Sequence, residues 1–290
     1  METSTGSELK TRLVNELAAA RAELDASDDV DRSTAVHRAR RALKRARSLY
    51  RVLEPIAGRD RDGRLGPVKQ AFKLLSVARD ADAMLATVER LRQRAKGGSA
   101  EVLGAVVASF AGLARRAHEA ELPIGRIADL LRAAERKAAQ LPVDFDAEAL
   151  VSDELASAYK HGRTAFRVVE ADANPDAWHA WRKAVKHRLH LTALRTPSAG
   201  PRHMLADLDA LAEMLGECND LANLTHAVER DPSIAGDGKA ARRVIAVFSK
   251  RQRRLRKRAL ALGEALYCQR SRLFAHGLTA ATSGGDHAAA

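Results

Sequence analysis

The chain has 290 residues, of which 46% are hydrophobic and only 4% aromatic, enough apolar material for one large or two ordinary domains. Its 49 Lys and Arg outnumber 37 Asp and Glu, for a formal net charge of +12. The expected partners are therefore polyanions: nucleic acid, a phosphate polymer or an anionic membrane surface. Two cysteines without CxxC spacing support neither a disulfide framework nor a zinc site.

Abundant Ala, Leu and Arg, with Gly and Pro mostly at short breaks, predict an all-α fold. Helical spacing predicts, in chain order, helices over residues 8–24, 36–53, 68–94, 101–122, 124–141, 147–169, 177–194, 202–229 and 240–274. Residues 58–67 are expected to form a loop, and residues 1–7 and 278–290 flexible tails. Residues 8–277 are expected to form one domain of two helical-bundle repeats, about 8–142 and 143–277.

No membrane insertion is expected, because no apolar run approaches the roughly 20 residues of a membrane span. The N-terminus is polar and lacks the apolar segment of a signal peptide. We therefore expect a cytoplasmic protein.

The segment over residues 36–53, VHRARRALKRARSLYRVL, has two opposite faces when wound as a helix. Its apolar face carries Val36, Ala39, Leu43, Ala46, Tyr50 and Leu53, and its cationic face carries His37, Arg40, Arg41, Lys44 and Arg51. No acid lies between Arg32 and Glu54 to relieve the repulsion among these cations. The cationic face therefore predicts an anionic partner.

The same pattern recurs 142 residues later, where the equivalents of His37, Arg40, Arg41 and Lys44 are His179, Arg182, Lys183 and Lys186. Downstream, residues 74–82 (LLSVARDAD) match residues 214–222 (MLGECNDLA) at an offset of 140, which pairs Asp80 with Asp220. Two matches in the same order predict a duplicated helical bundle.

HxxRRxxKRxR at 37–47 with LLSVARDAD, followed by HxxRKxxK at 179–186 with LGECND, resembles the CHAD family of histidine-bearing α-helical domains over about residues 8–277. The resemblance implies two pseudo-symmetric four-helix bundles whose basic faces line a shared groove or pore. It also implies binding of inorganic polyphosphate, association with polyphosphate granules, no catalytic activity and no cofactor. At 187–190 the chain departs from the family's KRLRY: Arg188 falls on the apolar face, where it snorkels, pairs with an acid of another helix or marks an irregular helix.

Polyphosphate exposes only phosphate oxygens, for which arginine supplies a planar fork and lysine a point charge. The expected contacts come from the two basic helices and from stripes on the helices over 147–169 and 240–274. They are His37, Arg40, Arg41, Lys44, Arg47, Arg51, Lys160, Arg163, Arg167, His179, Arg182, Lys183, Lys186, His190, Lys250, Arg254 and Lys257. The alternative for His37 and His179 is a structural role at neighbouring helices, and that for the stripe near Lys250 is a solvated face.

Asp80 and Asp220 have two interpretations, a metal site or an ion pair that orients an arginine of the cationic face. We favour the ion pair and expect no resident metal. Trp178 and Trp181 lie toward the apolar side of their helix and are expected in the core.

The leading hypothesis is a non-enzymatic polyphosphate-binding protein associated with polyphosphate granules. Nucleic-acid binding is a secondary candidate, because the charge allows it but few aromatic side chains are present to stack bases. A metal-dependent phosphohydrolase using His37, Asp80 and their repeats is less favoured, since no adjacent His-Asp pair or carboxylate cluster supplies enough ligands.

Overall fold

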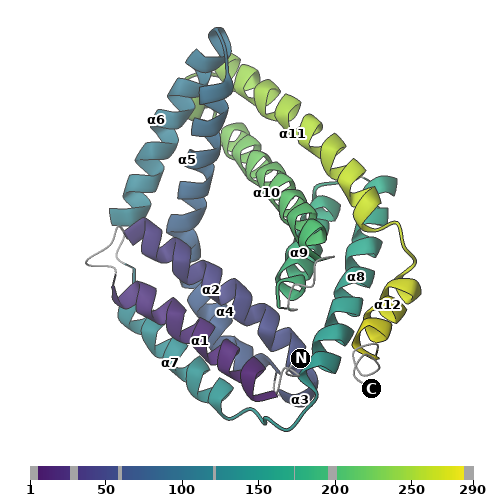
Figure 1. Cartoon of the computed structure of the whole chain (residues 1–290). Coiled ribbons are helices and arrows are strands. Elements are labelled where there is room, and N and C mark those ends of the chain that lie inside the picture. The colour runs from purple at the N-terminus through teal and green to yellow at the C-terminus, as the bar shows by residue number, and fades with distance from the viewer. Residues whose placement is uncertain are drawn as a thin grey trace.

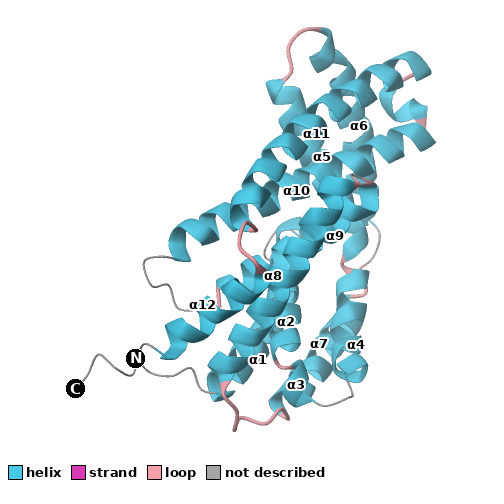
Figure 2. Ribbon diagram, turned by 90° about the vertical axis from the view of Figure 1, so that its right-hand side faces the viewer, coloured by secondary structure: helices cyan, strands magenta, loops and turns pink. Residues whose placement is uncertain are grey.

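The computed structural model (Figure 1) describes residues 6–26, 32–57, 61–119, 122–172, 174–194 and 201–283. Its described part contains helices and no strand, which confirms the all-α prediction (Figure 2). The helices are α1 (Gly6–Asp25), α2 (Arg32–Val52), α3 (Glu54–Ala57), α4 (Arg61–Leu74), α5 (Ser76–Arg94), α6 (Gly98–Glu119), α7 (Ile124–Ala139), α8 (Ala147–Ala171), α9 (Pro175–Thr192), α10 (Pro201–Arg230), the 3₁₀ helix η1 (Pro232–Ala235), α11 (Gly238–Leu266) and α12 (Ser271–Ser283).

Short polar side chains set the start of three helices. Asp146 accepts a hydrogen bond from the Ala149 amide at 2.9 Å, ahead of α8. Asn174 and Asp237 do the same ahead of α9 and α11, at 2.8 and 2.6 Å. Each bond satisfies an amide that has no partner within its own helix, which stabilises the helix start.

The single helix predicted over residues 68–94 is wrong, because the chain breaks at Leu75 into α4 and α5. Leu75 is fully buried, and side chains occupy the carbonyl oxygen of Phe72: Ser76 Oγ donates to it at 2.8 Å and Arg40 Nη1 at 3.3 Å. The predicted loop over 58–67 is also wrong from Arg61 onward, where α4 begins. Residues 58–60 lie outside the described part.

The single helix predicted over residues 240–274 is likewise two helices, α11 and α12. Side chains satisfy the carbonyls at the break: Arg188 Nη1 donates to the Leu266 oxygen at 3.0 Å, and the Tyr159 hydroxyl to the Gln269 oxygen at 2.9 Å. Tyr267 is 1% exposed between them. Residues of both expected tails are helical, since α1 begins at Gly6 and α12 ends at Ser283.

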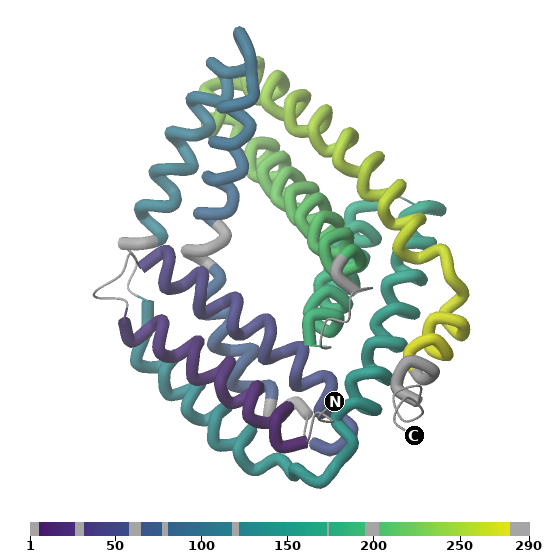
Figure 3. The backbone as a smooth tube through the Cα atoms, viewed as in Figure 1, coloured from purple at the N-terminus to yellow at the C-terminus, as the bar shows by residue number. Residues whose placement is uncertain are grey.

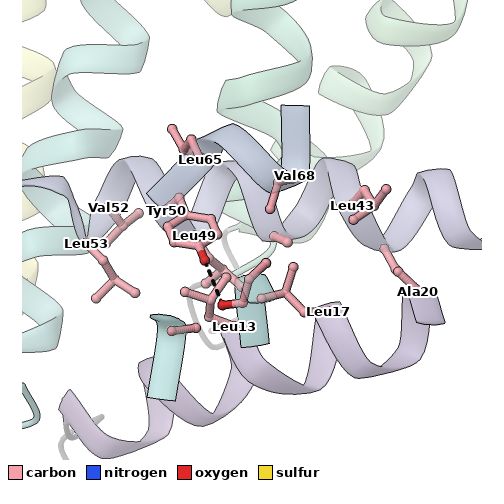
Figure 4. Close-up of a cluster of buried hydrophobic side chains, with 14 of the residues drawn as sticks. Leu13, Leu17, Ala20, Leu43, Leu49, Tyr50, Val52, Leu53, Leu65 and Val68 are labelled. Carbon is pink, nitrogen blue, oxygen red and sulfur yellow. Dashed lines mark hydrogen bonds between the residues drawn. The ribbon is translucent and has the colours of Figure 1, made fainter. Parts of the chain in front are cut away.

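Three hydrophobic cores hold the helices together. The first joins α1, α2, α4 and α7 with the first turns of α8. Figure 4 shows part of it, with Leu13 and Leu17 of α1 beside Leu49 of α2. Within this core the Tyr50 hydroxyl donates to the carbonyl oxygen of Ala134, at 3.3 Å.

Of the other two cores, the second crosses the boundary between the sequence repeats and the third lies within the second repeat. The second joins α5 and α6 of the first half to α10 and α11 of the second. The third lies among α8, α9, α10 and the end of α11, and it buries Trp178 and Trp181 as predicted. The α5 and α6 helices therefore share a core with α10 and α11 of the other half, whereas the third core lies within the second half.

Seen face-on, the helices surround a central space (Figures 1 and 3). The α2 helix runs along its lower side and α5 along its left side, with α11 at the upper right and α10 facing α2 across it. No helix in the described part is long and apolar enough to cross a membrane. Both cysteines are free: Cys218 is buried and Cys268 is exposed.

Candidate functional site

The central space contains a cavity of about 1050 Å³. It is lined by five helices drawn from both halves of the chain, α2, α5, α9, α10 and α11.

Among the described residues, eight Lys and Arg side chains line the cavity, from every lining helix except α10. They are Arg41, Lys44 and Arg45 of α2, Arg90 and Arg94 of α5, Lys186 of α9, and Arg251 and Arg258 of α11. Since four helices contribute, the cationic lining is a product of the tertiary arrangement and not of one basic helix.

Some of these cations already have partners within the protein. Arg45 Nε and Nη2 donate to the two carboxylate oxygens of Glu16 at 2.6 and 2.7 Å. Arg251 binds Glu217 in the same bidentate way, at 2.6 and 2.8 Å. Such charge-assisted pairs hold a guanidinium in one orientation. Arg90 donates to Thr87 Oγ1 at 3.0 Å.

Three lining guanidinium groups, by contrast, make neither an ion pair nor a hydrogen bond with any described residue. They are exposed and belong to three different helices: Arg41, Arg94 and Arg258. They are the groups best placed to receive an external anion.

The α10 helix contributes the acidic part of the lining, Asp209, Glu213, Glu217 and Asp220. Burial opposes ionisation of Glu217, but its hydrogen bonds to Arg251 and the charges of Arg251, Arg90 and Arg94 outweigh burial and lower its pKa. Four carboxylates against eight Lys and Arg leave an excess of four positive charges among the described lining residues.

His190 lines the cavity where α9 meets α2. Its Nδ1 lies 3.2 Å from Ser48 Oγ. Burial, followed by the positive charges of His187, Lys44, Lys186 and Arg45, lowers the pKa of His190 to about 4. Near neutral pH it therefore lines the cavity as an uncharged imidazole.

Of the 17 residues predicted to contact polyphosphate, four line the cavity: Arg41, Lys44, Lys186 and His190. Arg40 lies elsewhere. It is 8% exposed and points into the corner between α4 and α5, where Nη1 donates to Ser76 Oγ at 2.7 Å. Its guanidinium carbon lies 4.2 Å from the centre of the Phe72 ring. Arg40 therefore stabilises the break between α4 and α5.

The remaining predicted residues of the two basic helices lie outside the cavity lining. His37, Arg47 and Arg51 are exposed on α2. On α9, His179, Arg182 and Lys183 occupy the same arc as Lys186, one and two turns earlier. His179 Nδ1 lies 2.9 Å from the Asn219 side-chain oxygen of α10, so it contacts a neighbouring helix.

The two additional stripes also lie outside the lining. On α8, Lys160 and Arg167 are exposed and Arg163 is half-buried; Arg167 pairs with Glu170 at 2.7 Å. On α11 the exposed stripe of Lys250, Arg254 and Lys257 adjoins the cavity-facing arc but does not line it.

Arg188, at the point of departure from the family pattern, is 1% exposed and lies in an aromatic cage. Its guanidinium carbon is 4.7 Å from the ring centre of Tyr159, 4.9 Å from that of Tyr267 and 5.3 Å from that of Phe274. Its Nη1 donates to the Leu266 carbonyl. Arg188 thus holds α8, α9, α11 and α12 together, which none of the three sequence-based interpretations anticipated.

The two aspartates of the repeat lie on different helices, α5 and α10. Asp80 belongs to α5, and its side chain lies outside the described part of the structure. Asp220 lines the cavity. Among the described residues, no group of three or more His, Cys, Asp or Glu is placed to hold a metal ion.

Sequence reasoning missed Arg45, Arg90, Arg94, Arg251 and Arg258, as well as the acids of α10. The arginines carry no distinguishing local pattern, because their convergence depends on how helices cross. The acidity of α10 could have been predicted from the sequence, because the chain has six Asp or Glu and no Lys or Arg between His203 and Glu229.

Comparison with known proteins agrees with this architecture. The family model of the CHAD domain matches residues 12–229. Since this is more than half of the chain, the protein belongs to the CHAD domain family, as its two basic motifs predict.

Among solved structures, the crystal structure of the CHAD domain from the plant Ricinus communis has a similar fold, with a TM-score of 0.67 at 17% sequence identity. The alignment covers 93% of each chain. No curated protein matches the chain.

Proposed function

We propose that this protein binds inorganic polyphosphate in the central cavity and catalyses no reaction on it. The observation that carries the proposal is the excess of positive charge contributed by four helices around one cavity. The family membership supports it as well, through the polyphosphate binding expected of CHAD domains.

The size and shape of the cavity favour a thin, flexible polyanion. A volume of about 1050 Å³ is that of a site for a small ligand, so it holds a segment of a single chain and not a duplex. Arg41, Arg94 and Arg258 approach from three helices and can each donate to a different phosphoryl unit. Each charge-assisted hydrogen bond contributes about 1.5–3 kcal/mol before desolvation and ordering are deducted.

The cationic arcs continue beyond the cavity along both basic helices. His37 lies one turn before Arg41 on α2, and His179 and Lys183 lie up to two turns before Lys186 on α9. A chain longer than the cavity therefore meets further cations as it leaves. This supports a preference for long polymers and, through their multivalent binding, association with polyphosphate granules.

The lining also favours polyphosphate over nucleic acid and binding over catalysis. Among the described residues its lining contains no Phe, Tyr or Trp, the side chains that most often stack bases in single-strand sites. The described residues that line it include no Ser, Thr, Cys or Tyr, so they supply no hydroxyl or thiol nucleophile.

The test is a titration with polyphosphates of graded length at two salt concentrations. Replacing Arg41, Arg94 and Arg258 together with alanine is expected to weaken binding about 100-fold, from the loss of roughly 1 kcal/mol per contact. The matched control replaces Lys250, Arg254 and Lys257, which removes the same charge outside the cavity and is expected to weaken binding only a few-fold. Binding should also weaken steeply with salt, because bound phosphates release condensed counterions.

Equal losses in the two triple variants would refute the cavity as the site. Displacement of polyphosphate by duplex DNA at equal phosphate concentration would favour nucleic-acid binding instead. Release of orthophosphate in the presence of Mg²⁺ or Mn²⁺ would show that the protein is a phosphohydrolase.

A further inference from the structure

The α10 helix is acidic within a strongly basic protein. Its segment from His203 to Glu229 holds six Asp or Glu and no Lys or Arg, in a chain whose net charge is +12. Four of these acids line the cavity that the cations of α2, α5, α9 and α11 surround. One wall of the cavity therefore repels the kind of ligand that the other walls attract.

Two of the four acids make no contact with a described residue that would explain their presence. Glu217 holds Arg251 by two hydrogen bonds, but Asp209 and Glu213 are exposed and form no ion pair with a described residue. They lie four residues apart on one helix face, a spacing at which like charges destabilise a helix by a few tenths of a kcal/mol. Helix stability therefore gives no reason to keep them.

The first repeat shows that the fold does not require acids at these positions. At the offset of 140 that aligns Asp80 with Asp220, Asp209 corresponds to Lys69 and Glu213 to Lys73. Both lysines are exposed on α4. Two positive charges in the first repeat thus correspond to two negative charges in the second. In the second repeat, these residues face the cavity.

We propose that Asp209 and Glu213 determine specificity: they repel anions from α10 and confine a bound polyanion to the cationic helices. This inference rests on the proposed polyphosphate binding. A thin chain of phosphates can contact Arg41, Arg94 and Arg258 with Asp209 and Glu213 to one side, whereas a wider polyanion must place charge beside these carboxylates. Like charges brought together in this way reject wrong partners more strongly than they weaken the right one.

The test compares two double variants that change the net charge equally. Asp209→Asn with Glu213→Gln neutralises the cavity-facing pair. Asp207→Asn with Glu229→Gln is the control, because both residues are exposed on α10 and lie on the opposite side of the helix from the cavity. Affinities for long-chain polyphosphate and for an unstructured single-stranded DNA are measured for each variant and the unmodified protein, with circular dichroism to verify folding.

We expect the cavity-facing variant to bind polyphosphate about three- to tenfold tighter, as removal of two nearby like charges predicts. Its affinity for single-stranded DNA should rise by a larger factor, so its preference for polyphosphate falls. The control should change both affinities by the same small factor.

Two results would overturn the inference while leaving polyphosphate binding intact: a cavity-facing variant that behaves like the control, or one that gains equally for both ligands. If the unmodified protein itself shows no salt-sensitive binding of polyphosphate, the proposed function fails, and the inference fails with it.

Discussion

Ser48 and His190 are 142 residues apart, and Ser48 Oγ lies 3.2 Å from His190 Nδ1. The same offset of 142 relates the basic motif of α2 to that of α9, so these residues occupy equivalent positions in the two repeats. The crossing of α2 and α9 therefore brings equivalent positions of the two sequence motifs into contact at the edge of the cavity.

A second pair of contacts follows the same relationship. Arg45 of α2 binds Glu16 of α1 at 2.6 Å, and His187, the equivalent of Arg45, binds Glu154 of α8 at 2.6 Å. The contact between the first two helices of each repeat thus involves a glutamate in both halves, and its partner is arginine in one half and histidine in the other.

The low pKa of His190 predicts a pH-dependent stability that His190→Gln removes. In the folded protein the pKa is about 4, whereas the unfolded chain has the ordinary value near 6.5. Between these values the unfolded chain binds more protons, so the free energy of unfolding falls as pH decreases, by up to about 3 kcal/mol from this group. Urea unfolding at pH 7, 5.5 and 4.5 should show the unmodified protein losing more stability than the variant. Parallel losses in the two proteins would contradict the assignment.

Replacing Arg40 or Arg41, which are neighbours in the sequence, is expected to affect different properties: the stability of the fold for Arg40 and polyphosphate binding for Arg41. Arg40→Ala removes the hydrogen bonds to Ser76 and Phe72 and the stacking on the Phe72 ring, and should destabilise the fold by about 2 kcal/mol. Arg41→Ala removes an exposed cavity cation, and should change stability by less than about 0.5 kcal/mol while weakening polyphosphate binding. Thermal unfolding and binding measurements on both variants separate the roles, and a destabilised Arg41 variant would argue against this division.

Arg188 should tolerate no replacement, lysine included. Alanine would leave a void among Tyr159, Tyr267 and Phe274 and is expected to cost about 3 kcal/mol. Lysine keeps the charge but cannot stack as a flat guanidinium does, so Arg188→Lys should also destabilise, by more than about 1 kcal/mol. The exposed Arg167→Lys variant serves as the control in denaturant unfolding, and equal stability of the two lysine variants would contradict the role of the cage.

Two glycines in long helices should respond to alanine in opposite directions. A Cβ at Gly263 of α11 would lie 2.6 Å from Trp181 and 2.8 Å from Phe166, so Gly263→Ala should destabilise the third core by about 1–3 kcal/mol. A Cβ at Gly104 of α6 would meet nothing within 4 Å, so Gly104→Ala should stabilise by about 0.5–1 kcal/mol through helix propensity alone. Unfolding temperatures measured side by side check the sign of both changes.

The helix pattern and the repeat could be predicted from the sequence because both are local. Apolar residues at helical spacing and short polar caps such as Asn174 act within a few residues of each other. The two breaks inside predicted helices could not be predicted, since at Leu75 and at residues 267–270 the carbonyls are satisfied by Arg40, Arg188 and Tyr159. Except for Ser76 beside Phe72, these partners come from distant helices.

The sequence by itself determined the all-helical class, the duplicated basic motif and the family, because each depends on residue type and spacing along one chain. Only the tertiary structure decided which cations share a cavity: it brought Arg41, Arg94 and Arg258 together from three helices and turned Arg40 away into a helix break. It also placed the acids of α10 opposite those cations. The physical reason is that a helix presents cations over a broad arc, and the angles at which helices cross select the few that converge.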